Sequence, residues 1–572
     1  MKHITIILMF LTFSFDLSAR STLVTSASEI NSGSWMAGDT ILMKNGTWLN
    51  QSIILKATGK ISEPIVLLAQ TPGQVILTGS SKLAFSGSYM VVSGLFFKDG
   101  TLSGSEVVSF RTSSSEFANY CRLTNTAIVN YNPADKTVDS KWVSLHGEGN
   151  QVDHCSFENK TNSGTLLVVW LKSGIEPKHL IEQNYFGYRN SNLDANGSEI
   201  NGQEIIRIGD SSTSMQTASV TVRDNIFEKC NGETEIISNK SCGNLYSNNV
   251  FMSCSGMLTL RHGNNCTVEG NYFFGNGVSN TGGVRIIGEN HKVFNNYFEK
   301  LRGTGYRTAL CIVRGKENSL LNEYFQVKNA VVAFNTFVDC YQTFNINYNS
   351  SSTCTLPPIG TVIAHNNVYN TSTNNTNVII AQSDPTMDVT WKNNIMNLGK
   401  YSNFAPTSNQ VVTGLDPLMR LAGTSTNIFE PASESILSTY ATSEFPEIVT
   451  DIRGRSRSAL SKWPGSSQIS GETTRTMPSK TTVGASFFDN SVVAVRLTSK
   501  KPIMSAYVEN NELIAQISTP GTLSLFDTTG KMISIHTVTE GMHSKTLTNK
   551  GLFIVRFETS TDGSTIQKVI LQ

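Results

Sequence analysis

Hydrophobic and polar residues alternate along most of this chain in short runs, and the runs recur at a regular spacing. A run such as Val220-Thr221-Val222-Arg223 is followed closely by an Asn and then by apolar or aromatic residues. This unit recurs at Asn184, Asn225, Asn249, Asn271, Asn296 and Asn335, with weaker copies at Asn367 and Asn394 and a degenerate one at Cys155. Its aromatic residue returns after steps of 24, 22 and 25 residues between Phe227 and Phe298.

A repeat of this length with alternating strands is typical of a solenoid. No segment shows a long 3.6-residue period, which argues against helical repeats, and an antiparallel sandwich would not explain the regular spacing. We therefore predict an all-β chain in which residues 20–488 form a right-handed parallel β-helix. Val, Ile, Leu and Phe should point inward, and the recurring Asn side chains should stack at turns and bond the next coil.

The two ends of the chain differ from the repeat. Residues 1–19 combine Lys2, an apolar run over 4–13 and the exit Leu17-Ser18-Ala19, which is typical of a signal peptide, so we expect a secreted or cell-surface protein. No other apolar run is long enough to predict a membrane span. Residues 489–572 contain short strands separated by turns, which predict a small C-terminal β-sandwich.

The C-terminal segments Gly-Leu-Phe-Ile-Val-Arg (551–556) and Lys-Val-Ile-Leu (568–571) resemble the sorting domains of the type IX secretion system. That resemblance implies the type IX secretion machinery as a partner. A carbohydrate-binding or capping module is the alternative interpretation of the same strands.

The amino-acid composition argues against some classes of function. The 572 residues include 45 Lys and Arg against 44 Asp and Glu, a net charge of +1 that argues against a polycationic nucleic-acid binder. Hydrophobic residues make up 39%, enough for a sizeable core in a chain of this length. None of the nine Cys has the CxxC spacing of a zinc site, so we expect buried small hydrophobic residues, with disulfides left open.

The densest group of charged residues lies on three consecutive coils. Lys240, Arg261 and Arg285 follow the aromatic residue of their repeat by 13, 10 and 12 residues. Because neighbouring coils are about 4.8 Å apart, this shared phase predicts a ladder of cations on one face, suited to an anionic polymer. A solvated ladder of mutual salt bridges is the alternative.

Two carboxylates precede Lys240 on the same coil. Glu233 and Glu235 are two residues apart, so on a strand both point to the same side. This pair suggests a hard cation such as Ca²⁺, which takes six to eight oxygen ligands and would leave positions open for water and a substrate carboxylate.

The segment Asn-Gly-Glu-Thr-Glu-Ile-Ile-Ser-Asn-Lys-Ser (231–241), followed by Arg-His-Gly (261–263), resembles polysaccharide lyase family 6. That family contains alginate lyases and chondroitinase B on a right-handed parallel β-helix, and the resemblance covers most of residues 22–488. The segment Asn-Gly-Gln-Glu-Ile-Ile-Arg-Ile-Gly (201–209) is similar to the family segment whose Asn is a calcium ligand.

The resemblance implies cleavage of a uronic-acid polysaccharide by calcium-assisted β-elimination, which leaves an unsaturated uronate. It implies Ca²⁺ held by Asn201, Glu233 and Glu235, Lys240 as the Brønsted base, Arg261 as the Brønsted acid, and substrate binding by His262 and Arg285. Lys240 must be neutral to accept a proton, which Ca²⁺ and Arg261 would favour and the glutamates would oppose. Arginine is almost always protonated, so Arg261 would act mainly as a charge clamp.

The segment Gly-Gly-Val-Arg-Ile-Ile-Gly-Glu (282–289) looks like the alginate-lyase members, so alginate is the expected substrate. The alternatives are a chondroitinase B-type lyase acting on dermatan sulfate and a non-catalytic β-solenoid adhesin. A β-helix glycoside hydrolase would need two carboxylates across the scissile bond, whereas Glu233 and Glu235 as neighbours suit metal binding better.

Overall fold

The chain forms two compact units, residues 1–493 and 494–572, each of which is described by itself. The computed structural model describes residues 19–101, 106–194, 196–349, 351–372, 378–382, 387–422, 428–469, 471–489, 504–509, 512–517, 520–527, 531–547, 551–559 and 563–571. The expected signal peptide, residues 1–19, lies outside this set except for Ala19. The expected division at residue 489 borders undescribed residues and stays a prediction.

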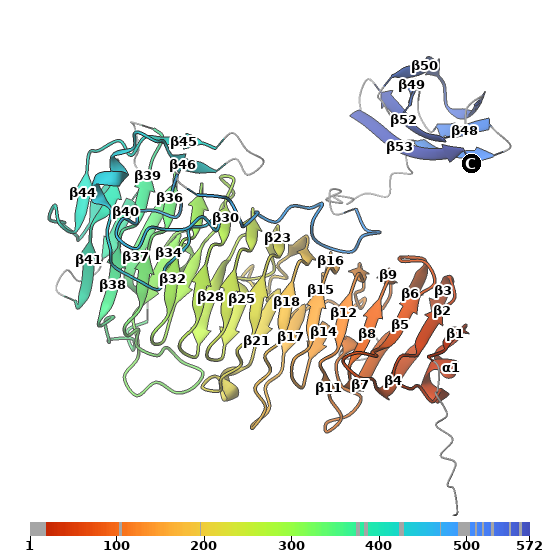
Figure 1. Ribbon diagram of the computed structural model, residues 1–572, viewed down its shortest axis with the longest axis horizontal. Helices are drawn as coiled ribbons and strands as arrows, with labels where there is room; N and C mark the ends of the chain where they lie inside the picture. The colour runs from red at the N-terminus through yellow and green to blue at the C-terminus, as the bar shows by residue number, and fades with distance from the viewer. Residues whose placement is uncertain are drawn as a thin grey trace, which may run out of the picture. The chain divides into compact units, whose positions relative to one another are not determined.

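The first unit is a parallel β-helix, as the repeat predicted (Figure 1). Most coils add one strand to each of three parallel sheets of 14 strands. Sheet 1 contains β1 (Ser21–Val24), β2 (Thr40–Met43), β5 (Ile65–Ala69), β8 (Met90–Ser93), β12 (Arg122–Thr124), β15 (Gln151–Asp153), β18 (Leu180–Glu182), β22 (Thr221–Arg223), β26 (Leu245–Ser247), β29 (Thr267–Glu269), β32 (Lys292–Phe294), β35 (Val331–Ala333), β38 (Thr361–Ala364) and β41 (Val389–Lys392).

Sheet 2 bears the charged residues singled out above on its middle strands. It contains β11 (Ala118–Asn119), β7 (Lys82–Ser88), β10 (Glu106–Ser109), β14 (Lys141–Leu145), β17 (Leu167–Val169), β21 (Ile206–Ile208), β25 (Glu235–Lys240), β28 (Met257–His262), β31 (Val284–Ile286), β34 (Leu310–Val313), β37 (Gln342–Tyr348), β40 (Val378–Gln382) and β43 (Lys400–Ser402), with β4 (Ser52–Thr58) paired to β7.

In most coils sheet 3 follows sheet 1 after a one- or two-residue turn, and a five-residue turn joins β5 to β6. It contains β3 (Gly46–Leu49), β6 (Val75–Thr78), β9 (Leu95–Lys98), β13 (Ala127–Val129), β16 (Ser156–Glu158), β19 (Tyr185–Phe186), β23 (Ile226–Glu228), β27 (Val250–Met252), β30 (Tyr272–Phe274), β33 (Tyr297–Glu299), β36 (Thr336–Val338), β39 (Asn367–Tyr369), β42 (Asn394–Met396) and β44 (Val411–Thr413). The remaining short elements of this unit are α1 (Ala27–Ser32), η1 (Ser211–Thr213), η2 (Gly305–Arg307), η3 (Ile436–Tyr440), β20 (Arg189–Asn190), β24 (Cys230–Asn231), β45 (Met419–Leu421) and β46 (Phe429–Pro431).

The corner between sheets 1 and 3 holds the predicted stack of asparagines. In each step the Nδ2 and backbone N–H of one Asn donate to the Oδ1 of the next, as Asn249 does to Asn271 at 3.0 Å in both bonds. The stack, called the asparagine ladder below, runs through Asn184, Asn225, Asn249, Asn271, Asn296, Asn335, Asn366 and Asn394. The predicted copy at Asn367 is wrong by one residue, because Val368 pairs with Phe337 and so places Asn366 in the corner.

Aromatic rings stack inside the same coils. Neighbouring ring centroids are 4.6 to 5.3 Å apart along the series Phe157, Phe186, Phe227, Phe251, Phe273, Phe298 and Phe337. All nine cysteines are buried free thiols, which confirms that they pack as small hydrophobic residues.

The N-terminal end of the β-helix is covered by α1. Ser26 caps this helix because its side chain accepts a hydrogen bond from the backbone N–H of Glu29, and Ala27 and Ile30 are buried.

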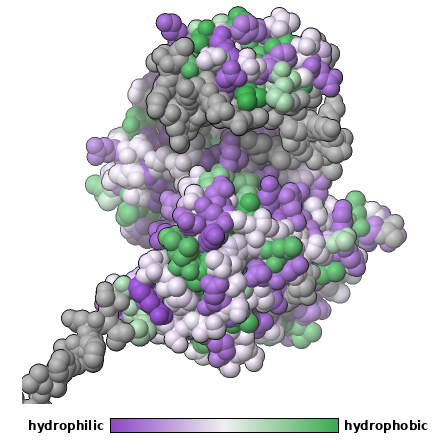
Figure 2. Space-filling model, turned by 90° about the vertical axis from the view of Figure 1, so that its right-hand side faces the viewer, coloured by the Kyte–Doolittle hydropathy of each residue, from purple (hydrophilic) through white to green (hydrophobic). Residues whose placement is uncertain are grey.

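Hydrophilic and hydrophobic residues are interspersed on the face shown in Figure 2. No helix in the described part of the chain has the length and apolar character needed to cross a bilayer.

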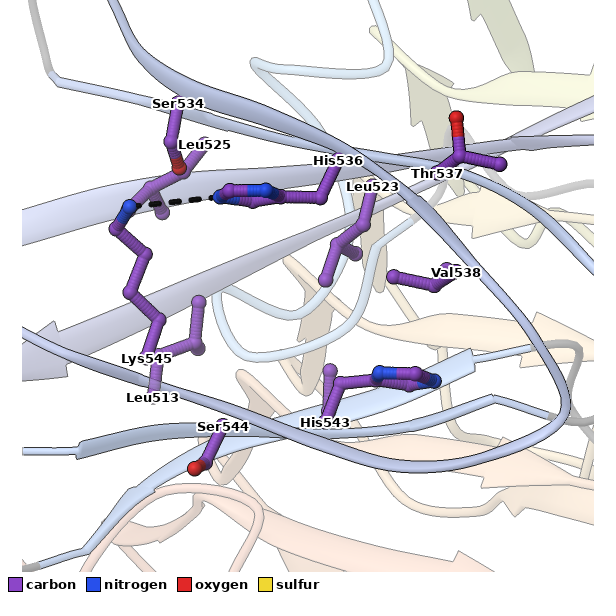
Figure 3. Close-up of a pocket in the computed structure, with 11 residues that line it drawn as sticks. Leu513, Leu523, Leu525, Ser534, His536, Thr537, Val538, His543, Ser544 and Lys545 are labelled. Carbon is purple, nitrogen blue, oxygen red and sulfur yellow. Dashed lines mark hydrogen bonds between the residues drawn. The ribbon is translucent and has the colours of Figure 1, made fainter.

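The second unit is a small antiparallel β-sandwich. One sheet orders β47 (Met504–Glu509), β48 (Glu512–Ile517) and β51 (Gly541–Thr546), and the other orders β50 (Met532–Val538), β49 (Gly521–Phe526), β52 (Gly551–Thr559) and β53 (Gly563–Leu571). Leu513, Leu525 and Phe557 belong to its buried core. A pocket of about 420 Å³ opens in this unit, and there Lys545 Nζ lies 3.5 Å from His536 Nε2 (Figure 3). None of the candidate site residues lies here.

Candidate active site

One pocket on the outer face of sheet 2 collects every candidate residue from the sequence. Its volume is about 480 Å³. Its lining includes Asn201, Glu233, Glu235, Lys240, Arg261, His262 and Arg285, together with Glu199, Ser211, Thr234, Tyr306, Asn322 and Tyr324. We call it the charged pocket.

Lys240, Arg261 and Arg285 reach this pocket from positions that do not all pair with one another across the strands. Lys240 pairs with His262, whereas Arg285 pairs with Thr259, two positions earlier along β28 than Arg261. The register shifts between Asn239 and Lys240, so Arg261 is an extra residue in β28. The three cations line one face, as their roughly shared phase predicted, but Arg261 and Arg285 do not lie at paired positions. A β-bulge redirects Arg261 into the same pocket, which is how bulges commonly act beside functional sites.

Glu233 lies in a bend before β25 and not on the strand with Glu235. The alternation of side chains along a strand therefore does not determine where Glu233 points. The Gly202 backbone N–H donates to its Oε2 at 2.8 Å, and its buried Oε1 has no hydrogen-bond partner among the described residues. Burial, followed by the charges of Glu204 and Glu235, raises the pKa of Glu233 to about 8. The surroundings of Glu233 therefore favour its protonated, neutral form at physiological pH unless a cation binds it.

Glu235 is neutralised by arginines. It forms an ion pair with Arg285 and lies 3.8 Å from Arg261 Nε, and the Ser238 hydroxyl donates to it. The Arg285 guanidinium is almost fully buried and also lies 5.2 Å from the ring centre of Tyr306. Glu235 therefore organises the two arginines whatever else it binds.

Lys240 opens onto the pocket above a carboxylate that the sequence analysis did not select. Its side chain is 18% exposed, and its Nζ lies 3.9 Å from Glu204 Oε1. Glu204 is 2% exposed and accepts a hydrogen bond from the Thr165 hydroxyl at 2.7 Å. A buried carboxylate beneath the amine holds Lys240 at this position.

Arg261 is fixed by a long loop after β34. Its Nη1 donates to the Glu323 carbonyl at 2.8 Å, its Nη2 donates to the Asn322 carbonyl at 3.3 Å, and the Tyr324 ring centre lies 4.4 Å from the guanidinium. Burial lowers the pKa of Arg261. Its side chain is thus held in one geometry and is a better proton donor than a solvated arginine.

His262 is buried behind Arg261. Burial, then the charges of Arg261, Lys240 and Arg285, lowers the pKa of His262 to about 3. The imidazole is therefore neutral at physiological pH, and its Nδ1 lies 3.4 Å from Arg261 Nη1. This geometry fits a residue that orients Arg261 as well as lining the pocket.

Asn201 lies at the rim, in the connection between β20 and β21, and is exposed. Together with Glu233 and Glu235 it supplies one amide and two carboxylates, oxygen ligands of the kind that Ca²⁺ takes. Among the described residues no group of three or more His, Cys, Asp or Glu is placed to hold a metal ion. The unpartnered Glu233 oxygen and its raised pKa fit a bound cation.

The residues that the sequence analysis missed come mainly from inserted segments. Tyr306 and Tyr324 lie in the 39-residue step between Phe298 and Phe337, which exceeds the regular repeat. The length of this insertion, directly after the charged coils, could have indicated that it contributes residues to the pocket. Glu204 carried no signal beyond its place three residues after Asn201.

Comparison with known proteins shows which family this chain belongs to. The sequence model of the family described as Chondroitinase B matches residues 24–422. No curated protein matches the chain.

Three solved structures are similar over much of the chain. The PL6 family alginate lyase AlyGC is 34% identical with a TM-score of 0.67, over 73% of this chain but only 56% of AlyGC. The PL6 family polysaccharide lyase Pedsa3628 from Pseudopedobacter saltans is 30% identical with a TM-score of 0.55, over 68% of this chain and 94% of its own. A mannuronic acid specific family 6 lyase from human gut microbiota is 29% identical with a TM-score of 0.57, over 67% of this chain and 86% of its own. The chain belongs to polysaccharide lyase family 6, the family of chondroitinase B.

Proposed function

We propose that this protein cleaves alginate by β-elimination at the charged pocket. The observation that carries the proposal is the placement of Lys240 and Arg261 in one pocket with Glu233, Glu235 and Arg285. The 34% identity to the alginate lyase AlyGC supports alginate as the polymer. Export to the cell exterior, expected from residues 1–19, is part of the same proposal.

The chemical difficulty is removal of a weakly acidic proton from C5, next to a carboxylate that resists further negative charge. Neutral Lys240 accepts the C5 proton, and the electron pair of that C–H bond forms the C4–C5 double bond as the C4–O4 bond breaks. Arg261 faces the leaving O4 and either donates its proton or stabilises the negative charge until water does so. The products are one new reducing end and one unsaturated uronate.

The substrate carboxylate needs a positive partner in this scheme. Arg285 supplies one from the pocket wall. Ca²⁺ held by Asn201, Glu233 and Glu235 would supply a stronger one when bound, by drawing charge from the carboxylate as it becomes enolate-like. The Glu233 carboxyl group supports this assignment, because its Oε1 has no partner among the described residues and its raised pKa shows that its ionised form lacks a nearby cation to stabilise it.

Dermatan sulfate is the second candidate substrate, because the matching family model is named for chondroitinase B. The two substrates share the uronate chemistry and differ in the sugars on either side of the cleaved bond. The test is the ultraviolet absorbance of unsaturated uronates, followed with purified protein on alginate and on dermatan sulfate in separate reactions. A rise on alginate alone supports the proposal, and a rise on dermatan sulfate alone replaces its substrate. No rise on either, with calcium added, would overturn it in favour of a non-catalytic binding role.

A further inference from the structure

The guanidinium of Arg261 is bound by the protein on several of its edges. Nη1 donates to the Glu323 carbonyl and Nη2 donates to the Asn322 carbonyl, at 2.8 and 3.3 Å. Nε lies 3.8 Å from Glu235 Oε1, and Nη1 lies 3.4 Å from His262 Nδ1. Loss of a proton from Arg261 would weaken this set of contacts, and a guanidinium is the weakest acid among the ionisable side chains. Arg261 is therefore better suited to act as a fixed positive charge than as a proton donor.

Tyr324 places a phenol beside this cation. Its ring centre lies 4.4 Å from the Arg261 guanidinium, and both side chains line the charged pocket together with Lys240. The Tyr324 side chain is only partly buried, and its hydroxyl makes no hydrogen bond to the described residues. A phenol is a stronger acid than a guanidinium ion, and a neighbouring cation stabilises the phenolate that remains after proton loss. The charged pocket therefore contains a second proton donor besides Arg261.

The loop that carries Tyr324 holds its ring in one position. The Lys316 backbone N–H donates to the Tyr324 carbonyl at 2.8 Å, and the Lys316 side chain forms an ion pair with Glu323. The Tyr324 ring also packs against a buried apolar cluster that includes Met257 and Cys311. A proton donor must be held within hydrogen-bond reach of the atom that it protonates, so this fixed position suits general acid catalysis.

We propose that Tyr324 is the general acid of the elimination and that Arg261 stabilises the phenolate that it forms. This inference rests on the proposed function, because it assigns the proton that reaches O4 in that reaction. As Lys240 takes the C5 proton, the electron pair of the C–H bond forms the C4–C5 double bond, and the C4–O4 electron pair leaves on O4. The Tyr324 O–H proton transfers to O4 in the same step. Solvent then returns a proton to the phenolate and Lys240 releases one, so no net proton is consumed.

The first test is Tyr324→Phe, which keeps the ring and its contact with Arg261 and removes only the hydroxyl. The measurements are kcat and KM on uronate oligomers that the wild type cleaves. We expect kcat to fall about 10²- to 10⁴-fold, the usual contribution of a general acid, and KM to change by less than about threefold. An unchanged kcat, or a rise in KM alone, would overturn the inference.

Tyr348→Phe is the matched control. Tyr348 packs against the same buried cluster as Tyr324 but does not belong to the lining of the charged pocket. Removal of its hydroxyl should leave kcat within about twofold of the wild type. An equal fall in both variants would show that loss of a hydroxyl disturbs the packing of this region and would contradict the inference.

The second test separates proton donation from a structural role of the Tyr324 hydroxyl. The probe is a uronoside with fluorine at C4, because fluoride leaves without receiving a proton. We expect Tyr324→Phe to release fluoride within about threefold of the wild-type rate, whereas Lys240→Ala should be slow on this probe and on oligomers. A loss on the probe as large as that on oligomers would contradict the inference. If the wild type cleaves no uronate polymer, the proposed function itself fails, whereas full activity of Tyr324→Phe overturns this inference alone.

Discussion

The asparagine ladder and the charged pocket lie on the same coils, but the ladder repeats from one coil to the next and the pocket does not. In the ladder each coil repeats the one before it: Asn249, Asn271 and Asn296 are buried, and each hydrogen-bonds to the next. In the pocket the repeat fails. The β25–β28 register shifts twice, between Glu235 and Ile237 and between Asn239 and Lys240. Strict repetition stabilises the solenoid, and departures from it expose reactive groups.

The two regions also differ in charge. The ladder consists of neutral amides that hydrogen-bond to the next Asn and to backbone carbonyls of the coils, as Asn249 does to Asn271 and Val222. The pocket concentrates buried ionisable groups, including a Glu233 oxygen without a partner. Such groups cost folding free energy and persist where function requires them. The predictions below alter one region at a time.

Replacing Lys240 with Ala should have the largest effect. We expect a loss of about 10²- to 10⁴-fold in kcat, because the general base is removed, and a lower free energy of unfolding, because the buried Glu204 carboxylate loses this ion-pair partner. Steady-state absorbance kinetics and denaturant titration measure the two quantities. Full activity in this variant would exclude Lys240 as the base.

Metal removal should also act on the pocket alone. A chelator should lower the rate about 10²-fold, and added Ca²⁺ should restore it, because the substrate carboxylate loses its strongest positive partner. Glu233→Gln should respond much less to either treatment. Undiminished activity of the metal-free protein would instead assign this role to cations such as Arg285.

Asn271→Ala should act on the ladder alone. It removes the acceptor of two buried donors from Asn249, which should lower the free energy of unfolding by about 3 kcal/mol. The activity per folded molecule should be kept. The exposed Asn196 provides the matched control, and Asn196→Ala should change stability by less than about 0.5 kcal/mol. Equal effects of the two substitutions would show that the ladder does not stabilise the coils.

The free energy of unfolding should also depend on pH, partly through His262, and this effect should be smaller than the preceding ones. Its pKa is about 3 in the folded protein against 6.5 ordinarily, so the unfolded chain binds more protons between these values and stability falls as the pH decreases through that range. In His262→Gln, the loss between pH 7.5 and pH 5 should shrink by about 1–2 kcal/mol. Asn271→Ala should instead lower stability by the same amount at both pH values. An unchanged acid dependence in His262→Gln would contradict this account.

The sequence alone was sufficient for the regular part of the molecule. The spacing of Asn and Phe predicted parallel coils because each coil must present the same side chain to its neighbour. It misplaced the ladder only at Asn367, where the adjacent Asn366 made the assignment ambiguous. Handedness and the domain boundary at residue 489 stay predictions.

The lining of the charged pocket was harder to predict, because strand register and loop conformation determine which side chains reach it. The repeat brought Lys240, Arg261 and Arg285 to one face, but the bulge at Arg261 has no signature in the spacing. Glu233 was expected on a strand and lies in a bend. Asn201 was selected only through the family resemblance, since its loop follows no repeat.

The central claim is that the charged pocket performs elimination. Mass spectrometry of the products from a uronate polymer digested in ¹⁸O-labelled water tests it most directly. We predict oligomers one water lighter than hydrolysis products, with no label introduced at the cleaved bond, and far fewer of them formed by Lys240→Ala. Products of full hydrated mass that carry the label would contradict the account and identify a hydrolase.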